Sequence, residues 1–453
     1  MKDRAKLIDT AKNYIIAYLL LSAVFLMFKA VVYEPDITLR SLISRFGSAS
    51  ENAEVSAGSV KKPVRTSSSI PMFILVTDEH STRHTVKYDD NEDISHYAVK
   101  YDNDEKNRMF SLFSSALGEA LGSSKDPEPI SADEWKQALG GSGVFFDYLY
   151  PQPLSTIAVG LGTEITENLS SDIARRLFLG NVDGNLLLYY ISEDSGTIYR
   201  CETASGFASL LSKIKEFPMG NAKFAFELHD EYENLDPYFI FSGESTKIRE
   251  VSAANPLRNG LPDEEALTEL LNLFEINSRI ASQHPEGTDG SVVYVENGRS
   301  LRIDMAGKML FSVTGKNGIV IPKSSDNLTI TDCISMCSQI VENSIGQVSG
   351  EGEIGLTSIK NLSFPSSCSI SFGYFIGGIP VTFPNGVYAA NFQINGGAIT
   401  RAEFRLREYT YSGDTTSAIP EKMAVAIVKS KGGEPILTYG DQNDGVTCTW
   451  IIN

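Results

Sequence analysis

The sequence predicts an α+β protein with antiparallel sheets that follows a single N-terminal transmembrane helix. Three observations support this class: one long apolar run near the start, many short runs of alternating apolar and polar residues, and a few segments with helical spacing. A chain of 453 residues exceeds one usual hydrophobic core and should contain about three folded units. The predicted divisions are a cytoplasmic tail (1–12), a transmembrane helix (13–33), a flexible tether (34–69), two α+β domains (70–163 and 164–258) and a C-terminal α+β domain (259–453).

The apolar run is long enough to cross a bilayer. It reads YIIAYLLLSAVFLMFKAVVY from Tyr14 to Tyr33, contains one charged residue, Lys29, and as a helix would span about 30 Å. Residues 1–12 carry four basic and two acidic side chains, a net charge of +2, so the rest of the chain carries −20. Because positively charged flanks stay inside, we expect the tail in the cytoplasm and everything beyond Tyr33 outside the cell membrane. A cleaved signal peptide is the alternative, but no A-x-A cleavage site follows the run.

The spanning helix offers a candidate surface for contact with a partner. Helices in lipid associate through small or polar side chains that allow close approach. Ser22, Ala23 and Ala30 are the candidates, and Ala23 and Ala30 lie seven residues apart on nearly one face. A plain anchor is the alternative, because alanine is common in spanning helices and no G-x-x-x-G motif is present.

Residues 34–69 are polar and rich in small side chains, which indicates a tether, and the pattern of a folded protein begins at Ile70. The first domain should contain a strand in PMFILVT (71–77), a helix with apolar residues between 109 and 121, a short helix with a capping box of Ser131 and Glu134, and a strand in GVFFDYLYP (143–151). The second should contain a helix near 173–178, a hairpin over 185–203, a helix with its apolar face at 207–214, and strands in NAKFAFELHD and DPYFIFSG.

Asp289 to Gly315 predicts a three-stranded β-meander at the heart of the C-terminal domain. Apolar and polar residues alternate over 292–296, 300–305 and 308–313. Asn297 and Gly298 form the first turn, and both are residue types that accept the positive φ of a type I′ turn. We therefore interpret these two residues as structural. The remaining C-terminal residues, 353–453, predict strands with one helix near 420–429.

The five cysteines cannot all pair within the chain, and their spacing predicts no particular disulfide. Cys333 and Cys337 have the spacing of a metal or redox pair. They also lie on the apolar face of a helix that continues through Ile340 and Val341, so we interpret both thiols as core residues.

Composition and motifs argue against several function classes. The chain has 39 Lys and Arg against 57 Asp and Glu, a net charge of −18, and no basic run with interleaved aromatics, so no nucleic-acid partner is expected. His80 and His84 have the spacing of a zinc helix but lack the H-E-x-x-H motif. The acidic run from Asp230 to Asp236 is interpreted as a solvated face. No catalytic, cofactor-binding or metal-binding residue is predicted, and a binding module is favoured over an enzyme.

The stretch from Ala266 to Val313 resembles the YycH-type (WalH) proteins. In that family, a short helix ends in an aromatic residue and Asn. The motif DG-x-x-VYVEN follows, and after it come the motif LRI and an Asp-Gly turn. The corresponding positions here are Phe274 with Asn277, Asp289 to Asn297, Leu301 to Ile303, and Ala306 with Gly307, so Ala306 departs from the pattern. FFDYLYPQPLS (145–155) resembles the first domain of the family. YFIGGIPV (374–381), YAANFQINGGAITRAEFRLREY (388–409) and VTCTWII (446–452) resemble its YycI-like last domain.

The resemblance implies an accessory regulator of the WalK (YycG) sensor histidine kinase of low-GC Gram-positive bacteria, spanning the cell membrane once. The expected partners are this kinase and a YycI-like membrane protein, and the family carries no catalytic residues. An envelope ligand-binding or assembly protein without a kinase partner is the alternative. The resemblance does not indicate whether the kinase would be activated or inhibited.

Overall fold

The computed structural model describes residues 70–78, 96–101, 103–228, 232–242, 247–288, 290–386, 388–428, 432–442 and 445–452. The chain divides into two compact units, residues 1–62 and 63–453, and all described residues belong to the second. The predicted tail (1–12), transmembrane helix (13–33) and tether (34–69) lie outside the described residues. Among the helices that are described, none combines the length and apolar character needed to cross a membrane.

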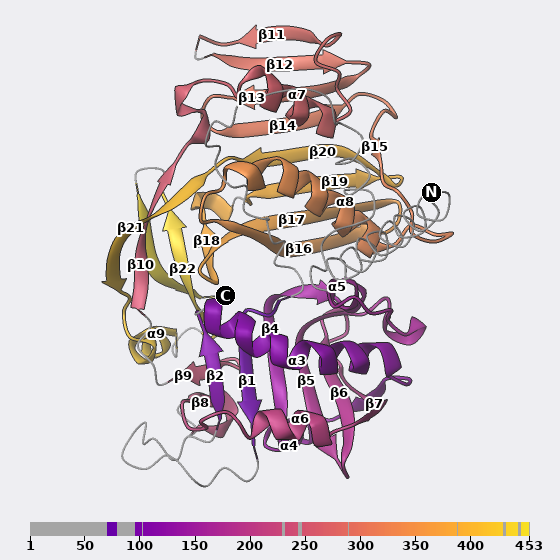
Figure 1. Cartoon of the computed structure of the whole chain (residues 1–453), viewed down its shortest axis with the longest axis vertical. Coiled ribbons are helices and arrows are strands. Elements are labelled where there is room, and N and C mark those ends of the chain that lie inside the picture. Colours follow the sequence, from indigo (N-terminus) through magenta and orange to yellow (C-terminus); the bar gives the residue numbers. More distant parts are fainter. Residues whose placement is uncertain are drawn as a thin grey trace, which may run out of the picture. The chain divides into compact units, whose positions relative to one another are not determined.

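The first half of the described chain forms one antiparallel sheet, which we call the N-terminal sheet (Figure 1). Its strands are β1 (Phe73–Thr77), β2 (Tyr97–Lys100), β3 (Glu128–Ile130), β4 (Gly143–Pro153), β5 (Ile173–Val182), β6 (Asn185–Ser192) and β7 (Ile198–Gly206). Their order across the sheet is β2-β1-β4-β5-β6-β7-β3. The helices are α3 (Asn103–Ser123), α4 (Ala132–Leu139), α5 (Leu154–Gly160) and α6 (Ala208–Ile214).

Helices cover both faces of this sheet. Met109 and Phe113 of α3 pack in one buried cluster with Phe146 of β4, and residues of α5 and α6 belong to the same cluster. Trp135 of α4 packs on the other face, and its ring lies 5.9 Å from that of Phe178. The predicted capping box is confirmed, because Ser131 caps α4 and the Glu134 side chain accepts from the Ser131 backbone.

Two predictions for this region are wrong. Residues 173–178 form part of strand β5, not a helix; Leu177, Phe178 and Leu179 are buried on both faces, and a continuous apolar run does not distinguish a buried strand from a helix. The predicted domain boundary at 163/164 falls inside one sheet, because β4 pairs with β5 across it. The connection between these strands contains α5, and the pairing of β4 with β5 across it depends on tertiary structure.

The C-terminal sheet contains most of the remaining strands. They are β11 (Ser282–Glu286), β12 (Ser291–Glu296), β13 (Arg299–Asp304), β14 (Lys308–Val313), β15 (Ile319–Val320), β16 (Glu353–Ser363), β17 (Ser367–Ile376), β18 (Ile379–Thr382), β19 (Ala390–Asn395), β20 (Ala398–Arg405), β22 (Pro435–Asp441) and β23 (Val446–Ile452). The main path runs β11-β12-β13-β14-β20-β19-β17-β18-β22-β23, with β15 beside β20 and β16 beside β17. All pairs are antiparallel except β18 with β22. The predicted α+β class with antiparallel sheets is therefore confirmed.

Smaller elements complete the chain. A two-stranded sheet is formed by β8 (Ala222–Phe224) and β9 (Ile240–Ser242), and another by β10 (Lys247–Ala254) and β21 (Glu408–Ser417). The pairing of β10 with β21 places residues before 258 with C-terminal ones, so the predicted boundary at 258/259 is also wrong. The C-terminal helix α9 (Glu421–Val428) lies where a helix was predicted.

The predicted meander is confirmed as β12, β13 and β14, which pair antiparallel in sequence order. Asn297 has φ of 49° and Gly298 has φ of 78°, as the turn between β12 and β13 requires. Because β12 also pairs with β11 and β14 with β20, the meander is part of a larger sheet and is not a separate unit.

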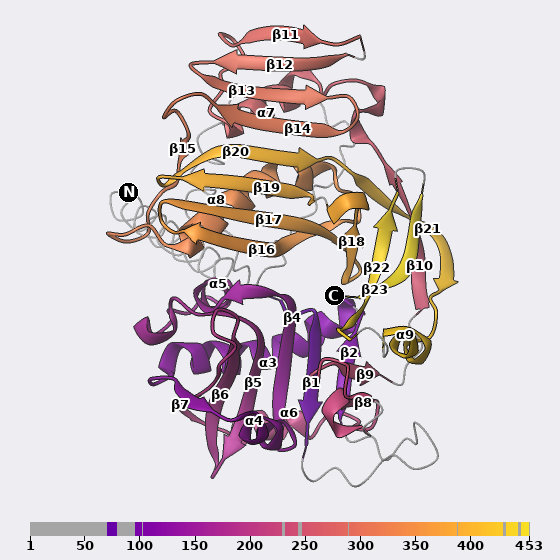
Figure 2. The same ribbon diagram turned by 180° about the vertical axis from the view of Figure 1, so that it is seen from behind.

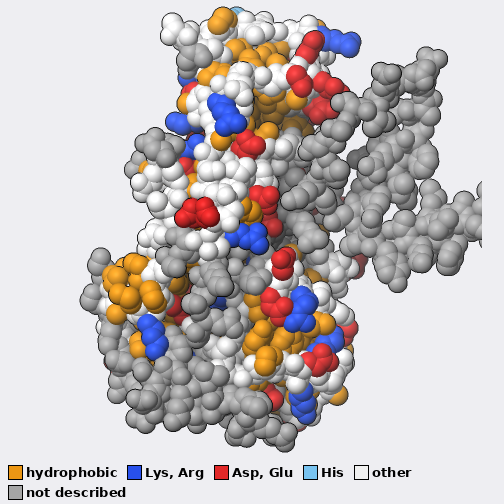
Figure 3. All heavy atoms as spheres, turned by 60° about the vertical axis from the view of Figure 1, so that its left-hand side comes forward, with side chains coloured by type: hydrophobic (Ala, Val, Ile, Leu, Met, Phe, Trp, Pro, Cys, Tyr) orange, Lys and Arg blue, Asp and Glu red, His pale blue; other side chains and the backbone are white. Residues whose placement is uncertain are grey.

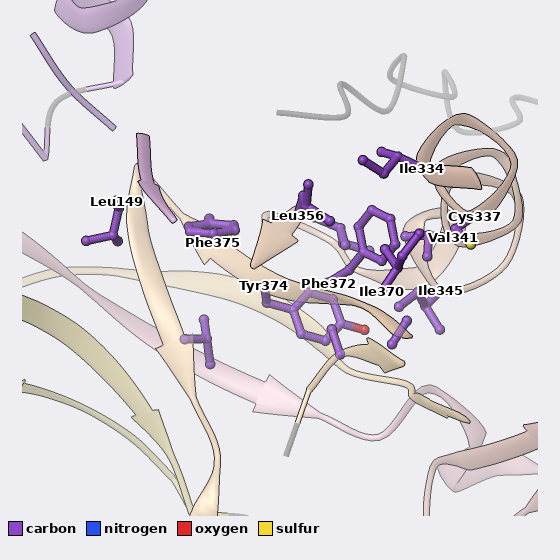
Figure 4. Packing of buried hydrophobic residues seen from close by; sticks show 14 of the residues in the cluster. Leu149, Ile334, Cys337, Val341, Ile345, Leu356, Ile370, Phe372, Tyr374 and Phe375 are labelled. Carbon is purple, nitrogen blue, oxygen red and sulfur yellow. The ribbon is translucent and has the colours of Figure 1, made fainter. Parts of the chain in front are cut away.

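Two helices cover one face of the C-terminal sheet. These are α7 (Glu264–Leu273) and α8 (Ile330–Asn343), both in front of the strands in Figure 1 and behind them in Figure 2. Cys337 and Val341 of α8 lie beside Ile370 and Phe372 of β17 (Figure 4). Cys333 and Cys337 are fully buried, which confirms them as core residues. All five cysteines are free thiols in the structure.

Candidate functional site

The candidate site is a cleft of about 670 Å³ between residues of the two large sheets, a volume within the range of small-molecule sites. The N-terminal sheet contributes the end of β4, two arginines of β5 and the end of β6 with the residue that follows it. The C-terminal sheet contributes β16, β17, the end of β18 and the segment that follows it. The lining residues are Leu149, Tyr150, Pro151, Arg175, Arg176, Ile191, Glu193, Asp236, Thr357, Ser358, Gly373, Val381, Thr382, Phe383, Gly386, Tyr388 and Ala389.

A cluster of charged side chains lies at the cleft, and we call it the charge cluster: Asp147, Arg175, Arg176, Asp236 and Glu434. Arg175, Arg176 and Asp236 line the cleft, and Asp147 and Glu434 contact these arginines. Consecutive residues of a regular strand point to opposite faces, yet Arg175 and Arg176 both contact Asp147. The register of β5 shifts against β6 between Ala174 and Leu177. This irregularity allows two neighbouring guanidinium groups to reach the same carboxylate.

Asp147 is the centre of the cluster. Its side chain is 2% exposed, and it accepts hydrogen bonds from Arg175 Nε at 2.7 Å and Arg175 Nη2 at 2.8 Å. Arg176 Nε donates to the same carboxylate at 3.2 Å. Burial alone would raise the pKa of Asp147, but the two arginine charges outweigh it and hold the pKa below its usual value.

Asp147 also supports an unusual backbone conformation at the cleft. Leu149 has φ of 66°, the left-handed region that a branched side chain rarely adopts. The Leu149 N–H donates to Asp147 Oδ1 at 2.7 Å, and the Leu149 side chain is buried. The turn presents the next residue, Tyr150, to the C-terminal sheet, where its ring lies 6.2 Å from that of Phe375.

Glu434 joins the cluster from the opposite end of the sequence. Arg175 Nη2 lies 2.7 Å from Glu434 Oε2, across 259 positions of the chain. Burial raises the pKa of Glu434, and the arginine charges only partly oppose this effect. Glu434 is therefore the carboxylate of this cluster whose charged form the fold disfavours.

Asp236 forms the outer edge of the cluster. Both of its oxygens accept from Arg176 Nη1 at 2.9 Å, and its side chain remains 29% exposed. The interpretation of residues 230–236 as a solvated acidic face is thus wrong for Asp236, which is paired with an arginine. Residues 229–231 lie outside the described residues.

The arrangement is suited to binding and to joining the two sheets. Three carboxylates face two guanidinium groups, so both arginines are already engaged within the cluster. No His or Cys is found among the described residues that line the cleft. Within the described part of the chain, no group of three or more His, Cys, Asp or Glu side chains is placed to hold a metal ion.

Of the predicted site residues, the structure describes two, and both lie outside this cleft. Asn297 and Gly298 form the β12–β13 turn and do not line the cleft. Ser22, Ala23 and Ala30 lie outside the described residues, so their contact role stays a prediction. The cleft residues were missed, although two signals were present: adjacent arginines within the apolar strand IARRLFLGNV and one aspartate within the apolar strand GVFFDYLYP.

No family model matches the chain, and no curated protein does. The crystal structure of YycH from Bacillus subtilis matches with a TM-score of 0.52, over 87% of this chain and 97% of that one, at 12% sequence identity. The chain has a YycH-like fold. A structure of an uncharacterized protein from Eubacterium rectale matches with a TM-score of 0.31 and 12% identity, over 45% of this chain and 76% of that one, which is too low to indicate a shared fold. The resemblance to YycH-type proteins is thus confirmed at the level of the fold.

Proposed function

We propose that this protein is a membrane-anchored, extracytoplasmic accessory regulator of a cell-envelope-sensing histidine kinase, acting by protein–protein association. The observation that supports this proposal most directly is the YycH-like fold, which extends over 87% of the chain. The proposed partners are a sensor kinase of the WalK type and a YycI-like membrane protein, as the sequence resemblance implies. The proposal includes no catalytic step. The arginines of the charge cluster already pair with its carboxylates, and the described residues that line the cleft include no His or Cys.

An exposed apolar surface supports association as the mode of action. Ile419, Met423 and Ile427, in and beside α9, are 50%, 59% and 58% exposed. Hydrophobic side chains gather on the surface around α9 in Figure 3. Contiguous exposed apolar side chains are typical of surfaces that bind other proteins.

Co-purification tests the proposal. The full-length chain, tagged at its C-terminus, is recovered from gently solubilised membranes, and an unrelated single-pass protein with the same tag serves as the control. We expect a histidine kinase and a YycI-like protein to be enriched with this chain and absent from the control. Recovery of neither protein would contradict the proposal.

A matched pair of variants tests the apolar surface within the same experiment. Met423→Glu with Ile427→Glu places charges on α9, and we expect it to reduce recovery of the kinase. Val320→Glu is the control, because Val320 is 71% exposed in β15 and lies outside this surface. Equal recovery with both variants would assign the contact to another part of the chain.

The cleft favours one alternative, an envelope protein that binds a ligand without a kinase partner. A volume of about 670 Å³ suffices for a small ligand. This alternative predicts that soluble envelope fragments raise the melting temperature of the purified chain while no kinase co-purifies. Kinase recovery without any such thermal shift would exclude it.

A further inference from the structure

Figure 2 shows the face of the C-terminal sheet that α7 and α8 leave uncovered. A second hollow, which we call the groove, lies on this face and is lined by residues of β13, β14, β19 and β20. Phe274, which follows α7, packs on Phe311 of β14 at 5.1 Å and on Phe404 of β20 at 5.6 Å, which identifies the covered face. Neighbouring residues of the same strands point the other way. On that other face, Lys308 of β14 is the direct register partner of Arg405 of β20.

The groove has a volume of about 470 Å³ and concentrates positive charge in a chain whose net charge is −18. Six charged side chains line it. Four are basic, Arg302, Lys308, Arg401 and Arg405, and two are acidic, Asp304 and Glu403. Such a local reversal of sign favours an anionic ligand.

Two of the four basic side chains are neutralised and two are not. Arg302 Nε lies 3.0 Å from Glu286 Oε2, and Arg401 Nη2 lies 2.7 Å from Glu403 Oε1. In the described residues, Lys308 and Arg405 form no ion pair. Their donors therefore remain available to an anion that enters the groove.

Arg405 has a second feature of a receptor for anions. Its guanidinium carbon lies 4.7 Å from the centre of the Phe383 ring, which holds the planar group against an aromatic surface. Arg405 Nε is buried and has no hydrogen-bond partner in the described structure. A buried donor without an acceptor is costly, and a bound carboxylate would satisfy it.

The extent of the groove lining, which continues on both sides of the adjacent donors Lys308 and Arg405, indicates an extended ligand. Arg302 lies on β13, Lys308 on β14 and Arg405 on β20, and the lining continues to Asn391 on β19. Because adjacent strands are about 4.8 Å apart, these four strands extend over about 14 Å. A single small anion cannot bridge this distance, whereas about four residues of extended polypeptide can.

We propose that the groove binds an extended acidic segment of a protein partner, with the Lys308 ammonium and the Arg405 guanidinium as the carboxylate receptors. This inference depends on the proposed function only for the identity of the partner. The groove and the cleft share Gly386 and Tyr388, so the groove adjoins the cleft.

Peptide binding to the full-length chain in detergent tests the groove without any kinase. The probe is a fluorescein-labelled octapeptide of alternating Asp and Ser, and the control probe carries Asn in place of Asp. We expect the Lys308→Gln/Arg405→Gln double variant to bind the acidic probe at least about tenfold more weakly at low salt, because it loses two charge-assisted contacts. Arg108→Gln is the control variant, because Arg108 lies on α3 with a side chain that is 61% exposed.

Three results would overturn the inference. These are equal affinity of the wild type and the double variant, equal affinity for the acidic and the Asn probes, and equal competition by an Asp-Ser dipeptide and the unlabelled octapeptide. The melting temperatures of the double variant and of Arg108→Gln are compared to check folding. If the double variant folds poorly, the single variant Lys308→Glu is tested in its place, because Lys308 is an exposed side chain.

Kinase recovery then separates the two proposals. If the wild type recovers the kinase and the folded double variant does not, both proposals are supported. Equal recovery by both chains would overturn the groove as the contact and leave the proposed function standing. Peptide binding at the groove without any recovered kinase would contradict the proposed function alone.

Discussion

Asp147 and Glu434 contact the same arginine, yet their pKa values are shifted in opposite directions. Asp147 accepts from two arginines and from the Leu149 backbone, so its charge is well compensated. Glu434 loses more hydration than Arg175 and Arg176 restore. At the residue scale, the cluster therefore contains one carboxylate that the fold needs charged and one that the fold would tolerate neutral.

This difference predicts unequal effects of two isosteric substitutions. At pH 7, Asp147→Asn should lower the free energy of unfolding by about 3–5 kcal/mol, because it leaves two buried guanidinium groups undercompensated. Glu434→Gln should lower it less, because burial raises the pKa of Glu434 and so already disfavours its charged form. Urea denaturation of the purified variants measures both. Equal destabilisation by the two substitutions would contradict the assignment.

The pH dependence has opposite signs at the two positions. Asp147 has a lowered folded pKa, so its contribution is present above its unfolded pKa of about 3.9 and is lost as pH falls toward the folded value. Glu434 has a raised folded pKa, so its ionisation costs stability as pH rises above its unfolded pKa of about 4.3. The penalty of Asp147→Asn should thus shrink at acidic pH, and any benefit of Glu434→Gln should grow as pH rises above about 4.3.

At the element scale, local chemistry defines the β12–β13 hairpin. Gly298 has φ of 78°, and a Cβ atom placed there would lie 2.9 Å from Thr314 Oγ1 and 3.0 Å from Asn317 Nδ2. Both the backbone conformation and the available space therefore require glycine. The neighbouring chain reinforces the turn, because the Thr314 N–H donates to the Gly298 carbonyl at 2.7 Å.

Gly298→Val should lower the free energy of unfolding by about 1–2 kcal/mol, the cost of a left-handed conformation for a residue with a Cβ atom. Gly206→Val is the matched control, because Gly206 ends β7 outside the left-handed region and has open space around its Cα. Thermal unfolding of the two variants is the measurement. If Gly298→Val were no less stable than Gly206→Val, the turn would not be structurally required.

The predicted spanning helix allows a second test at this scale. Ala23→Leu with Ala30→Leu keeps the helix apolar but blocks close approach of another helix. If the helix contacts the kinase, the double variant should reach the membrane at normal levels and recover less kinase. Undiminished recovery would place the contact in the residues beyond the membrane, where α9 and the groove are the candidates.

At the scale of the whole molecule, polar contacts connect the two large sheets. Arg175 of β5 pairs with Glu434, which precedes β22, and Ser155 Oγ of α5 lies 2.7 Å from Thr331 Oγ1 of α8. Apolar contacts connect the sheets as well, because one buried hydrophobic cluster contains Leu149 of β4 and Phe375 of β17. Both sheets and the contacts between them belong to the part of the chain that we propose lies outside the membrane.

Protease accessibility tests that proposed topology. Residues 1–12 carry a net charge of +2 and precede the apolar run, so we expect protease added to intact spheroplasts to degrade the chain beyond residue 69. A cytoplasmic protein that stays intact serves as the control for lysis. Protection of the folded region in intact spheroplasts would contradict both the topology and the proposed regulatory role.

Several elements were predictable because their causes are local. Asn297 with Gly298 determines a hairpin turn, the Ser131 and Glu134 pair determines the start of α4, and the spacing of Cys333, Cys337 and Val341 determines the buried face of α8. In each case a few neighbouring residues supply both the signal and the geometry. The sequence resemblance to YycH-type proteins likewise anticipated the fold over most of the chain.

The tertiary structure decided what depends on residues far apart in sequence. A buried run such as residues 173–179 suits a strand or a helix until its neighbours are known, and only the pairing of β4 with β5 settles it. The charge cluster joins Arg175 to Glu434 across 259 positions, and the groove forms because β20 lies beside β14. Sequence alone specified local backbone preferences and the faces to be buried, whereas the order of strands in the two sheets decided which charges meet.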